Sequence, residues 1–139
     1  MTDQPQLDAR ILDDVADALI YSDRSGTIVR WNRASSALFG FSAEEALGQN
    51  LDLIIPEHLR AAHWKGFEAA IASGAMKLAG RPTLTRALHK SGRRLYIEMT
   101  FALVRDAGGA VQGSVAMARD VTERVERERA AKAATSQNS

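Results

Sequence analysis

The chain has 139 residues, of which 45% are hydrophobic and 25% charged, and its formal net charge at pH 7 is +1. A chain of this length forms one compact hydrophobic core rather than two. The balance of positive and negative side chains argues against a nucleic-acid partner. The absence of cysteine excludes disulfides, thiolate metal sites and thiol nucleophiles.

The N-terminus and the hydropathy pattern bear on the compartment. The first residues are polar and lack the basic and apolar regions of a signal peptide. No apolar run approaches the roughly 20 residues that a membrane-spanning helix needs. We therefore expect a soluble, cytoplasmic protein without a membrane partner.

The first third of the chain predicts a helix, a hairpin and two short helices. Apolar side chains at helical spacing, with aspartates between them, predict an N-terminal amphipathic helix within residues 1–17. Residues 18–32 contain two apolar runs around an Asp-Arg-Ser-Gly turn, which is typical of a β-hairpin. A short helix is expected to end near Gly40, and the spacing of Ser42 and Glu45 predicts the capping box of another.

The middle of the chain predicts one long helix followed by strands. Pro56 precedes a helical segment over residues 57–73, which a Ser-Gly pair ends. Pro82 places the first of the strands after it at a sheet edge or at a strand start. Glycine-containing turns separate three strand candidates, over residues 77–89, 94–105 and 111–119.

The end of the chain predicts an exit helix. Asp120 begins a capping box that starts a charged helix over residues 120–134, and we expect residues 135–139 to be disordered. The order of elements predicts an α+β domain with a five-stranded antiparallel sheet and helices over one face. Its core spans residues 18–119, and the two terminal helices lie outside it.

Three segments of the sequence resemble the PAS sensory domains, in that family's order. They are Asp23-x-x-Gly26-x-Ile28-x-x-Trp31-Asn32-x-Ala34 followed by Phe39-Gly40-Phe41-Ser42-x-Glu44-Glu45-x-Leu47-Gly48, then Ile54-Ile55-Pro56, and then Lys90-x-Gly92 through Arg119-Asp120-Val121-Thr122-Glu123-Arg124. The resemblance implies a PAS fold that binds a small ligand between the sheet and the long helix and is not itself an enzyme. It also implies that a change passes to the flanking helices, and we expect an effector protein to make the output in trans.

The segment from Ile55 to His63 resembles more particularly the haem-bearing oxygen sensors of the family. In those proteins an Ile-Pro…Arg-x-x-His run supplies the proximal iron ligand, and this chain has Ile55-Pro56 followed by Arg60-x-x-His63. The resemblance therefore implies that His63 binds the iron of haem b in a gas or redox sensor. A neutral imidazole on an apolar helix face suits that role.

The other residues of this hypothetical haem site lie on the same helix and on the strands. Phe67 shares a helix face with His63, while Met99 and Phe101 would form an apolar wall opposite. Counted forward from His63 without gaps, the family's distal methionine falls on Arg81 and its distal arginine on Thr83. The long side chain of Arg81 could hydrogen-bond bound oxygen or a propionate.

One other interpretation remains open. His63 could be a structural histidine, in a colourless interaction module whose cavity is empty or holds a generic apolar ligand. The flavin-dependent light sensors of the family need a reactive cysteine, and this chain has none. An apolar cavity would draw on Ile28, Phe39, Phe67, Ile71, Met76, Met99, Phe101 and Met117.

The N-terminal helix also suggests a partner. Its apolar side must be buried on its own sheet or against a second protomer, which leads us to expect a homodimer through the flanking helices. That side consists of Leu7, Ile11, Leu12 and Val15.

Overall fold

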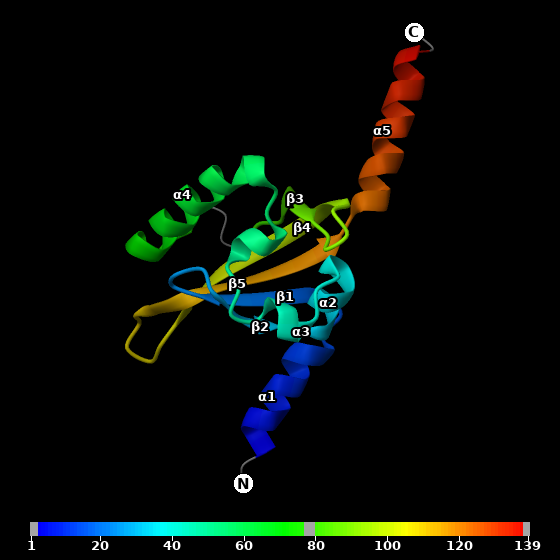
Figure 1. Ribbon diagram of the computed structural model, residues 1–139. Coiled ribbons are helices and arrows are strands. Elements are labelled where there is room, and N and C mark those ends of the chain that lie inside the picture. Colours follow the sequence, from blue (N-terminus) through cyan, green and yellow to red (C-terminus); the bar gives the residue numbers. More distant parts are fainter. Residues whose placement is uncertain (1–2, 77–79, 138–139) are drawn as a thin grey trace.

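The structure is a computed structural model that describes residues 3–76 and 80–137 (Figure 1). Its first half contains α1 (Asp3–Asp14), β1 (Ala18–Asp23), β2 (Ile28–Trp31), α2 (Arg33–Phe39), α3 (Ala43–Ala46) and the 3-10 helix η1 (Leu51–Ile54). Its second half contains α4 (Glu57–Ser73), β3 (Thr83–Leu88), β4 (Arg94–Arg105), β5 (Val111–Asp120) and α5 (Thr122–Gln137). The predicted α+β class and the predicted order of elements are both confirmed.

The five strands form one antiparallel sheet in the order β2-β1-β5-β4-β3. Tight turns join β3, β4 and β5 into a meander, and the pairing of β1 with β5 brings the first hairpin beside the last strand. β4 is twice as long as β3, and their pairing ends where Thr83 meets Met99. The second half of β4 therefore extends beyond its neighbour, and β3 does not cover that edge.

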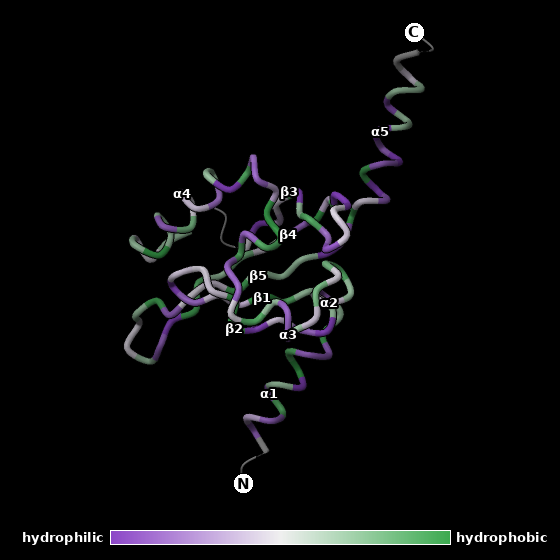
Figure 2. Tube along the Cα trace, in the orientation of Figure 1, coloured by the Kyte–Doolittle hydropathy of each residue, from purple (hydrophilic) through white to green (hydrophobic). Residues whose placement is uncertain are grey.

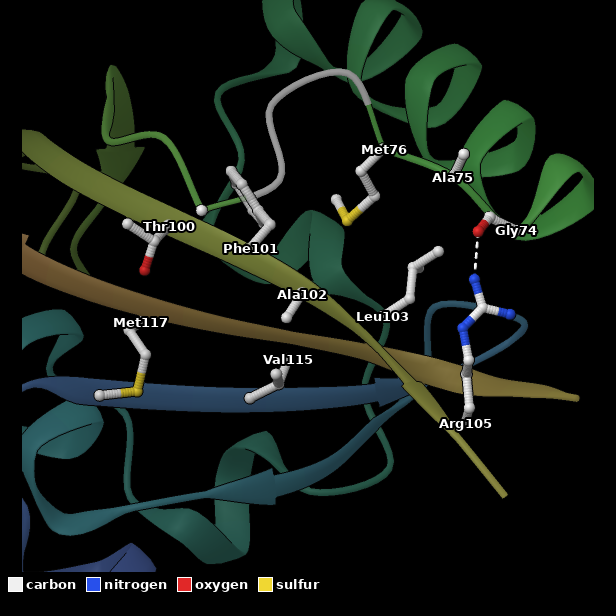
Figure 3. Close-up of a pocket in the computed structure, with 11 residues that line it drawn as sticks. Gly74, Ala75, Met76, Thr100, Phe101, Ala102, Leu103, Arg105, Val115 and Met117 are labelled. Carbon is white, nitrogen blue, oxygen red and sulfur yellow. Dashed lines mark hydrogen bonds between the residues drawn. The ribbon is translucent and has the colours of Figure 1, made fainter. Parts of the chain in front are cut away.

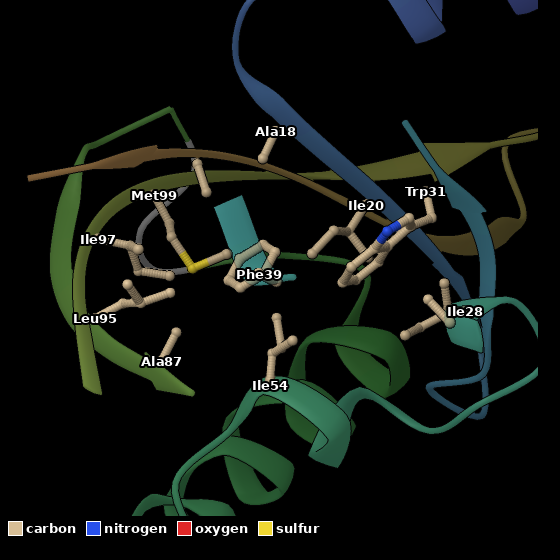
Figure 4. Packing of buried hydrophobic residues seen from close by; sticks show 12 residues of the cluster. Ala18, Ile20, Ile28, Trp31, Phe39, Ile54, Ala87, Leu95, Ile97 and Met99 are labelled. Atoms are coloured by element: carbon tan, nitrogen blue, oxygen red, sulfur yellow. The ribbon is translucent and has the colours of Figure 1, made fainter. Parts of the chain in front are cut away.

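The hydrophobic core lies between one face of the sheet and the short helices. Phe39 of α2 has an exposed fraction of 0% and lies between Met99 and Trp31 (Figure 4). Leu95, Ile97 and Met99 alternate along β4 and are all buried, as the period-two pattern predicts. The three short helices complete the cluster, so this part of the sheet is closely covered.

Local signals set the turns between these elements as predicted. Gly40 ends α2 with a φ of 82°, a left-handed conformation that favours glycine. Ser42 and Glu45 form the expected reciprocal capping box of α3. Asn32 caps α2 by accepting from the backbone N–H of Ser35, and its amide nitrogen donates to the carbonyl of Leu12. One buried asparagine thus ties the end of α1 to the core.

Three predicted boundaries were wrong. α1 ends at Asp14 rather than near residue 17, because the chain turns there to enter β1. The strand predicted over residues 77–89 begins only at Thr83, directly after Pro82, which cannot donate to a sheet; residues 77–79 lie outside the described residues. The exit helix continues to Gln137, so residues 135–137, which we expected to be disordered, are helical.

The start of α5 also differs from the predicted capping box. Asp120 accepts from the backbone N–H of Thr122, two residues on, rather than three residues on as a capping box requires. The hydroxyl of Thr122 instead exchanges hydrogen bonds with the backbone of Tyr96. This arrangement fastens the first turn of α5 to the beginning of β4.

The flanking helices project from the core in opposite directions (Figure 1). Hydrophilic and hydrophobic residues alternate along both of them and along α4 (Figure 2). In α5, Val125 is buried at 6% exposure, whereas Leu7 and Ile11 of α1 are 53% and 51% exposed. None of the helices in residues 3–76 and 80–137 combines the length and the hydropathy that crossing a membrane requires.

Candidate functional site

The first half of α4 is fastened to the turn and 3-10 helix that precede it. The indole nitrogen of Trp64 donates to Asp52 Oδ1 at 2.7 Å, and Arg60 Nε donates to the carbonyl of Ile55 at 3.0 Å. The Trp64 ring also covers Gly26 in the first hairpin so closely that a Cβ there would lie 2.2 Å from the indole. Arg60, the arginine of the Arg-x-x-His motif, therefore has a structural role at the entry to α4.

The far end of α4 is tied to the sheet by one side chain. Gly74 ends the helix with a φ of 71°, and its carbonyl accepts a hydrogen bond from the guanidinium of Arg105 on β4. Between these two ends α4 packs lightly. Of its 17 residues, all of them described, only Ala70 is buried. α4 is therefore attached to the rest of the domain at two places, through its first half to η1 and through its last turn to β4.

His63 lies partly buried on α4 between two aromatic rings of the same helix. Its ring makes an edge contact with Trp64, with centroids 4.8 Å apart, and stacks on Phe67 at 5.9 Å. Burial lowers the pKa of the imidazole below its ordinary value, and the nearby carboxylate of Asp52 opposes this shift only in part. The lowered pKa favours the neutral imidazole, which is the form in which histidine binds a metal.

Three buried polar atoms lack a hydrogen-bond partner among the described residues: Nδ1 of His63, Oγ of Ser22 and Oγ1 of Thr83. Ser22 lies two residues after Ile20 of the core on β1 and therefore shares its face of the sheet, and Thr83 pairs with buried Met99. Both hydroxyls therefore belong to the helix-covered face of the sheet. An unmade hydrogen bond of this kind costs about 1–3 kcal/mol, which a bound polar group would recover.

The predicted haem-site residues fall into separate places. His63 and Phe67 stack on α4, while Thr83 lies beside Met99, which packs in the core against Phe39 (Figure 4). Arg81 is exposed in the segment before β3. These positions show which residues lie together, and they leave the haem hypothesis untested.

The remaining predicted residue, Phe101, lines a cavity of about 550 Å³ at the end of α4 (Figure 3). Its walls are Gly74, Ala75, Met76, Gly80, Thr100, Phe101, Ala102, Leu103, Arg105, Val115 and Met117. Of the eight apolar residues that the sequence suggested for a cavity, Met76, Phe101 and Met117 line this one. Ile28, Phe39 and Met99 instead belong to the packed core.

Sequence reasoning missed several of these residues. A usable signal existed for Ser22, since it is a polar residue at a core position of the alternating β1 pattern. The roles of Asp52 and Trp64 depend on how α4 folds back over η1. The contact of Arg105 with Gly74 joins residues 31 positions apart, and no local pattern indicates it.

Comparisons with known proteins agree with this architecture. The model of the PAS fold family matches residues 6–121. The chain therefore belongs to the PAS family, as its motifs suggested. The computed structure is similar to the PAS domain of a protein from Colwellia psychrerythraea, with a TM-score of 0.74 and 25% identity over 86% of this chain and 98% of that one.

Further relatives connect the chain with sensors. It is 42% identical over 53 residues, or 38% of its length, to the sensor protein FixL of Bradyrhizobium diazoefficiens, of which the match covers 10%. An RNA-binding light-oxygen-voltage receptor has a TM-score of 0.73 and 27% identity, over 98% of this chain and 38% of that one. An uncharacterised protein of Azorhizobium caulinodans is 35% identical over 121 residues, which is 86% of this chain.

The curated relatives are much longer than this chain, which spans 16% of the Azorhizobium protein. The comparisons identify a PAS sensory domain related to parts of larger sensor proteins. The activity of those whole proteins does not transfer with the domain.

Proposed function

We propose that this PAS domain binds a small ligand or cofactor between α4 and the sheet and passes a change in its state to the flanking helices. The observation that carries the proposal is His63, whose buried Nδ1 has no hydrogen-bond partner among the described residues. Ser22 and Thr83 add unpaired hydroxyls on the sheet side of the same layer. A bound molecule would satisfy groups that the described protein residues do not.

Haem b is the cofactor that we propose for this site, with His63 as the residue that holds it. The fit rests on a neutral, partly buried imidazole with a free nitrogen, flanked by the rings of Trp64 and Phe67. When bound, the haem iron would supply reversible binding of a gas or a change of oxidation state. The chain itself would hold the imidazole neutral and shield it with aromatic rings.

Haemin titration of the purified protein, followed by absorption spectroscopy, tests the cofactor. We expect a Soret band that shifts with dithionite and with carbon monoxide and that is lost in His63→Ala. His58→Ala is the matched control, because His58 is an exposed residue of the same helix and its loss should leave the spectrum unchanged. A flat spectrum after reconstitution, or equal bands in both variants, would reject haem and favour the colourless interaction module.

Self-association is a second proposed property, and the exposed side of α1 supports it. Leu7 and Ile11 are each about half exposed, and a second copy of the chain would cover them. In sedimentation analysis we expect a dimer that Ile11→Glu weakens. Gln6→Glu adds the same charge at another exposed position of α1 and should leave the dimer intact. Equal sedimentation of all three proteins would contradict this proposal.

The route to a partner would run through the anchors of the two flanking helices. Asn32 holds the end of α1, and Thr122 holds the start of α5 against β4. A shift of the sheet beneath α4 would reach both helices through these bonds. We propose that an effector protein, acting in trans, responds to their changed position, and that the domain itself performs no catalytic step.

A further inference from the structure

The cavity at the end of α4 lies along the second half of β4. Thr100 and Ala102 share one face of the sheet with Met117 and Val115, their partners on β5, while Phe101 and Leu103 alternate to the other face. Since residues of both faces line the cavity, it follows the part of β4 that lies beyond β3. His63 is not among its lining residues.

The walls of this cavity suit an apolar molecule of modest size. Met76 and Phe101 lie close to Leu103 on the α4 side (Figure 3). A volume of about 550 Å³ lies within the range of small-molecule sites, which is roughly 300–1,000 Å³. The lining is mainly hydrophobic, and Arg105 is its one charged member among the described residues.

Arg105 brings to this cavity a positive charge that no described carboxylate neutralises. Its guanidinium donates to the carbonyls of Gly74 and Gly109, which are neutral, and it belongs to none of the ion pairs among residues 3–76 and 80–137. The adjacent Asp106 is engaged in its own turn, where one carboxylate oxygen accepts from the backbone of Gly108 and Ala110. A guanidinium has five N–H donors, so three remain available to an anion.

We propose that this cavity binds an amphipathic monocarboxylate, with its carboxylate on Arg105 and its apolar body against Phe101, Leu103 and Met76. The inference rests on the proposed function in taking the domain to be a ligand sensor. Of the residues predicted for the haem site it uses only Phe101, and it does not use His63. It assigns charge complementarity to one end of the ligand and hydrophobic burial to the other. Binding there would join α4 to β4 at the point where Arg105 already connects them.

Calorimetric titration of the full chain with sodium decanoate, below its micelle-forming range, tests the site. We expect saturable binding that Arg105→Gln weakens by about tenfold or more, the size expected for hydrogen bonds to a charged group. Arg94→Gln removes an exposed arginine at the other end of β4 and should leave the affinity unchanged. No saturable binding to the wild-type chain, or equal weakening by both variants, would overturn the proposal.

A second ligand separates the two ends of the site. Decanol lacks the carboxylate, so it should bind the wild-type chain more weakly than decanoate and should bind Arg105→Gln with the same affinity as the wild type. Leu103→Asn should weaken both ligands, because it changes the apolar wall. Decanol binding that falls in Arg105→Gln as far as decanoate binding does would show that the variant has only disturbed the end of α4, and would reject the ion pair.

His63→Ala distinguishes the failure of this proposal from the failure of the haem proposal. Decanoate should bind His63→Ala as it binds the wild type, whatever the outcome of the haemin titration. If decanoate binding is lost in His63→Ala and retained in Arg105→Gln, the ligand binds near His63 and not at the last turn of α4. That result would overturn the assignment to Arg105.

Discussion

The two parts of the layer above the sheet are packed in different ways. On one side the short helices bury Phe39 and Ala46 completely, at 0% exposure, and Ile54 almost completely, at 5%. On the other side α4 has one buried residue and leaves a histidine nitrogen without a partner among the described residues. The comparison teaches that close packing and unpaired polar groups occupy separate parts of one layer: the short helices bury the core, while α4 packs loosely and leaves a histidine nitrogen unpaired among the described residues.

The largest expected effect on stability comes from removing a large side chain from the closely packed part. Phe39→Ala should lower the free energy of unfolding by about 3–5 kcal/mol, because it removes a fully buried aromatic side chain and leaves a cavity. Phe67→Ala on α4 should cost less than half as much, since Phe67 is only partly buried. Urea denaturation of both variants measures the difference. Equal losses would show that the two parts are packed alike.

A smaller effect is expected where α4 meets the first hairpin. Gly26 has a φ of 83°, and alanine in that conformation costs about 1–2 kcal/mol before any contact is counted. Its Cβ would also displace the Trp64 ring, so Gly26→Ala should change the fluorescence of that tryptophan in a Trp31→Phe background. Gly48→Ala is the control, because Gly48 has a similar φ of 86° and no atom within 4 Å of the added Cβ. Loss of stability in both variants with unchanged Trp64 emission would argue against the contact.

The anchor of α4 on η1 should have a still smaller effect. Asp52→Ala removes the acceptor of the Trp64 indole, which we expect to cost about 1 kcal/mol because the pair is partly exposed. Hydrogen exchange should quicken in α4 and stay unchanged in α2. Asp14→Ala removes an exposed ion pair with Arg33 and should change neither helix. Faster exchange throughout the chain in Asp52→Ala would mean that α4 is not separately anchored.

The smallest expected effect is a dependence of stability on pH. Burial lowers the pKa of His63 in the folded chain below its ordinary value of 6.5. As the pH falls below that value, the unfolded chain takes up a proton at this position more readily than the folded chain, so the free energy of unfolding decreases. Above it both states are neutral, and the contribution vanishes.

Denaturation at about pH 7.5 and about pH 5.5 measures this dependence. His63→Gln should lose less stability between the two pH values than the wild type does, because the titrating group is gone. His58→Gln, on the exposed side of α4, should lose as much as the wild type. A steeper loss in His63→Gln than in the wild type would show that the sign of the pKa shift is wrong.

Much of the fold followed from local patterns. The bounds of α4, the capping box of Ser42 and Glu45, and the left-handed Gly40 each depend on residues within a few positions of one another. The predicted boundaries were wrong where the position of a strand in the sheet, and not the local pattern, set the end of an element. α1 ended earlier than predicted because the chain then enters β1, which pairs with β5. The first strand of the meander began only after Pro82.

The candidate site was less accessible to such reasoning. The i, i+4 spacing of His63 and Phe67 placed both on one face of α4, where their rings do stack. By contrast, Arg60 was expected to matter only as part of a haem motif, and it proves to bind the carbonyl of Ile55. A motif indicates which residues are present, while their partners depend on how neighbouring elements meet.

The sequence by itself determined the order and type of the elements and the antiparallel meander, because periodicity, caps and turn residues act over short distances along the chain. Its ordered motifs also indicated the PAS family, whose model matches residues 6–121. Only the tertiary structure decided which polar groups remained unpaired and where charge met an apolar cavity. Ser22 and Thr83 face the same layer from strands far apart in the chain, and Arg105 reaches Gly74 across 31 residues. Contacts of that kind arise from the pairing of β1, β5 and β4, which brings distant segments together.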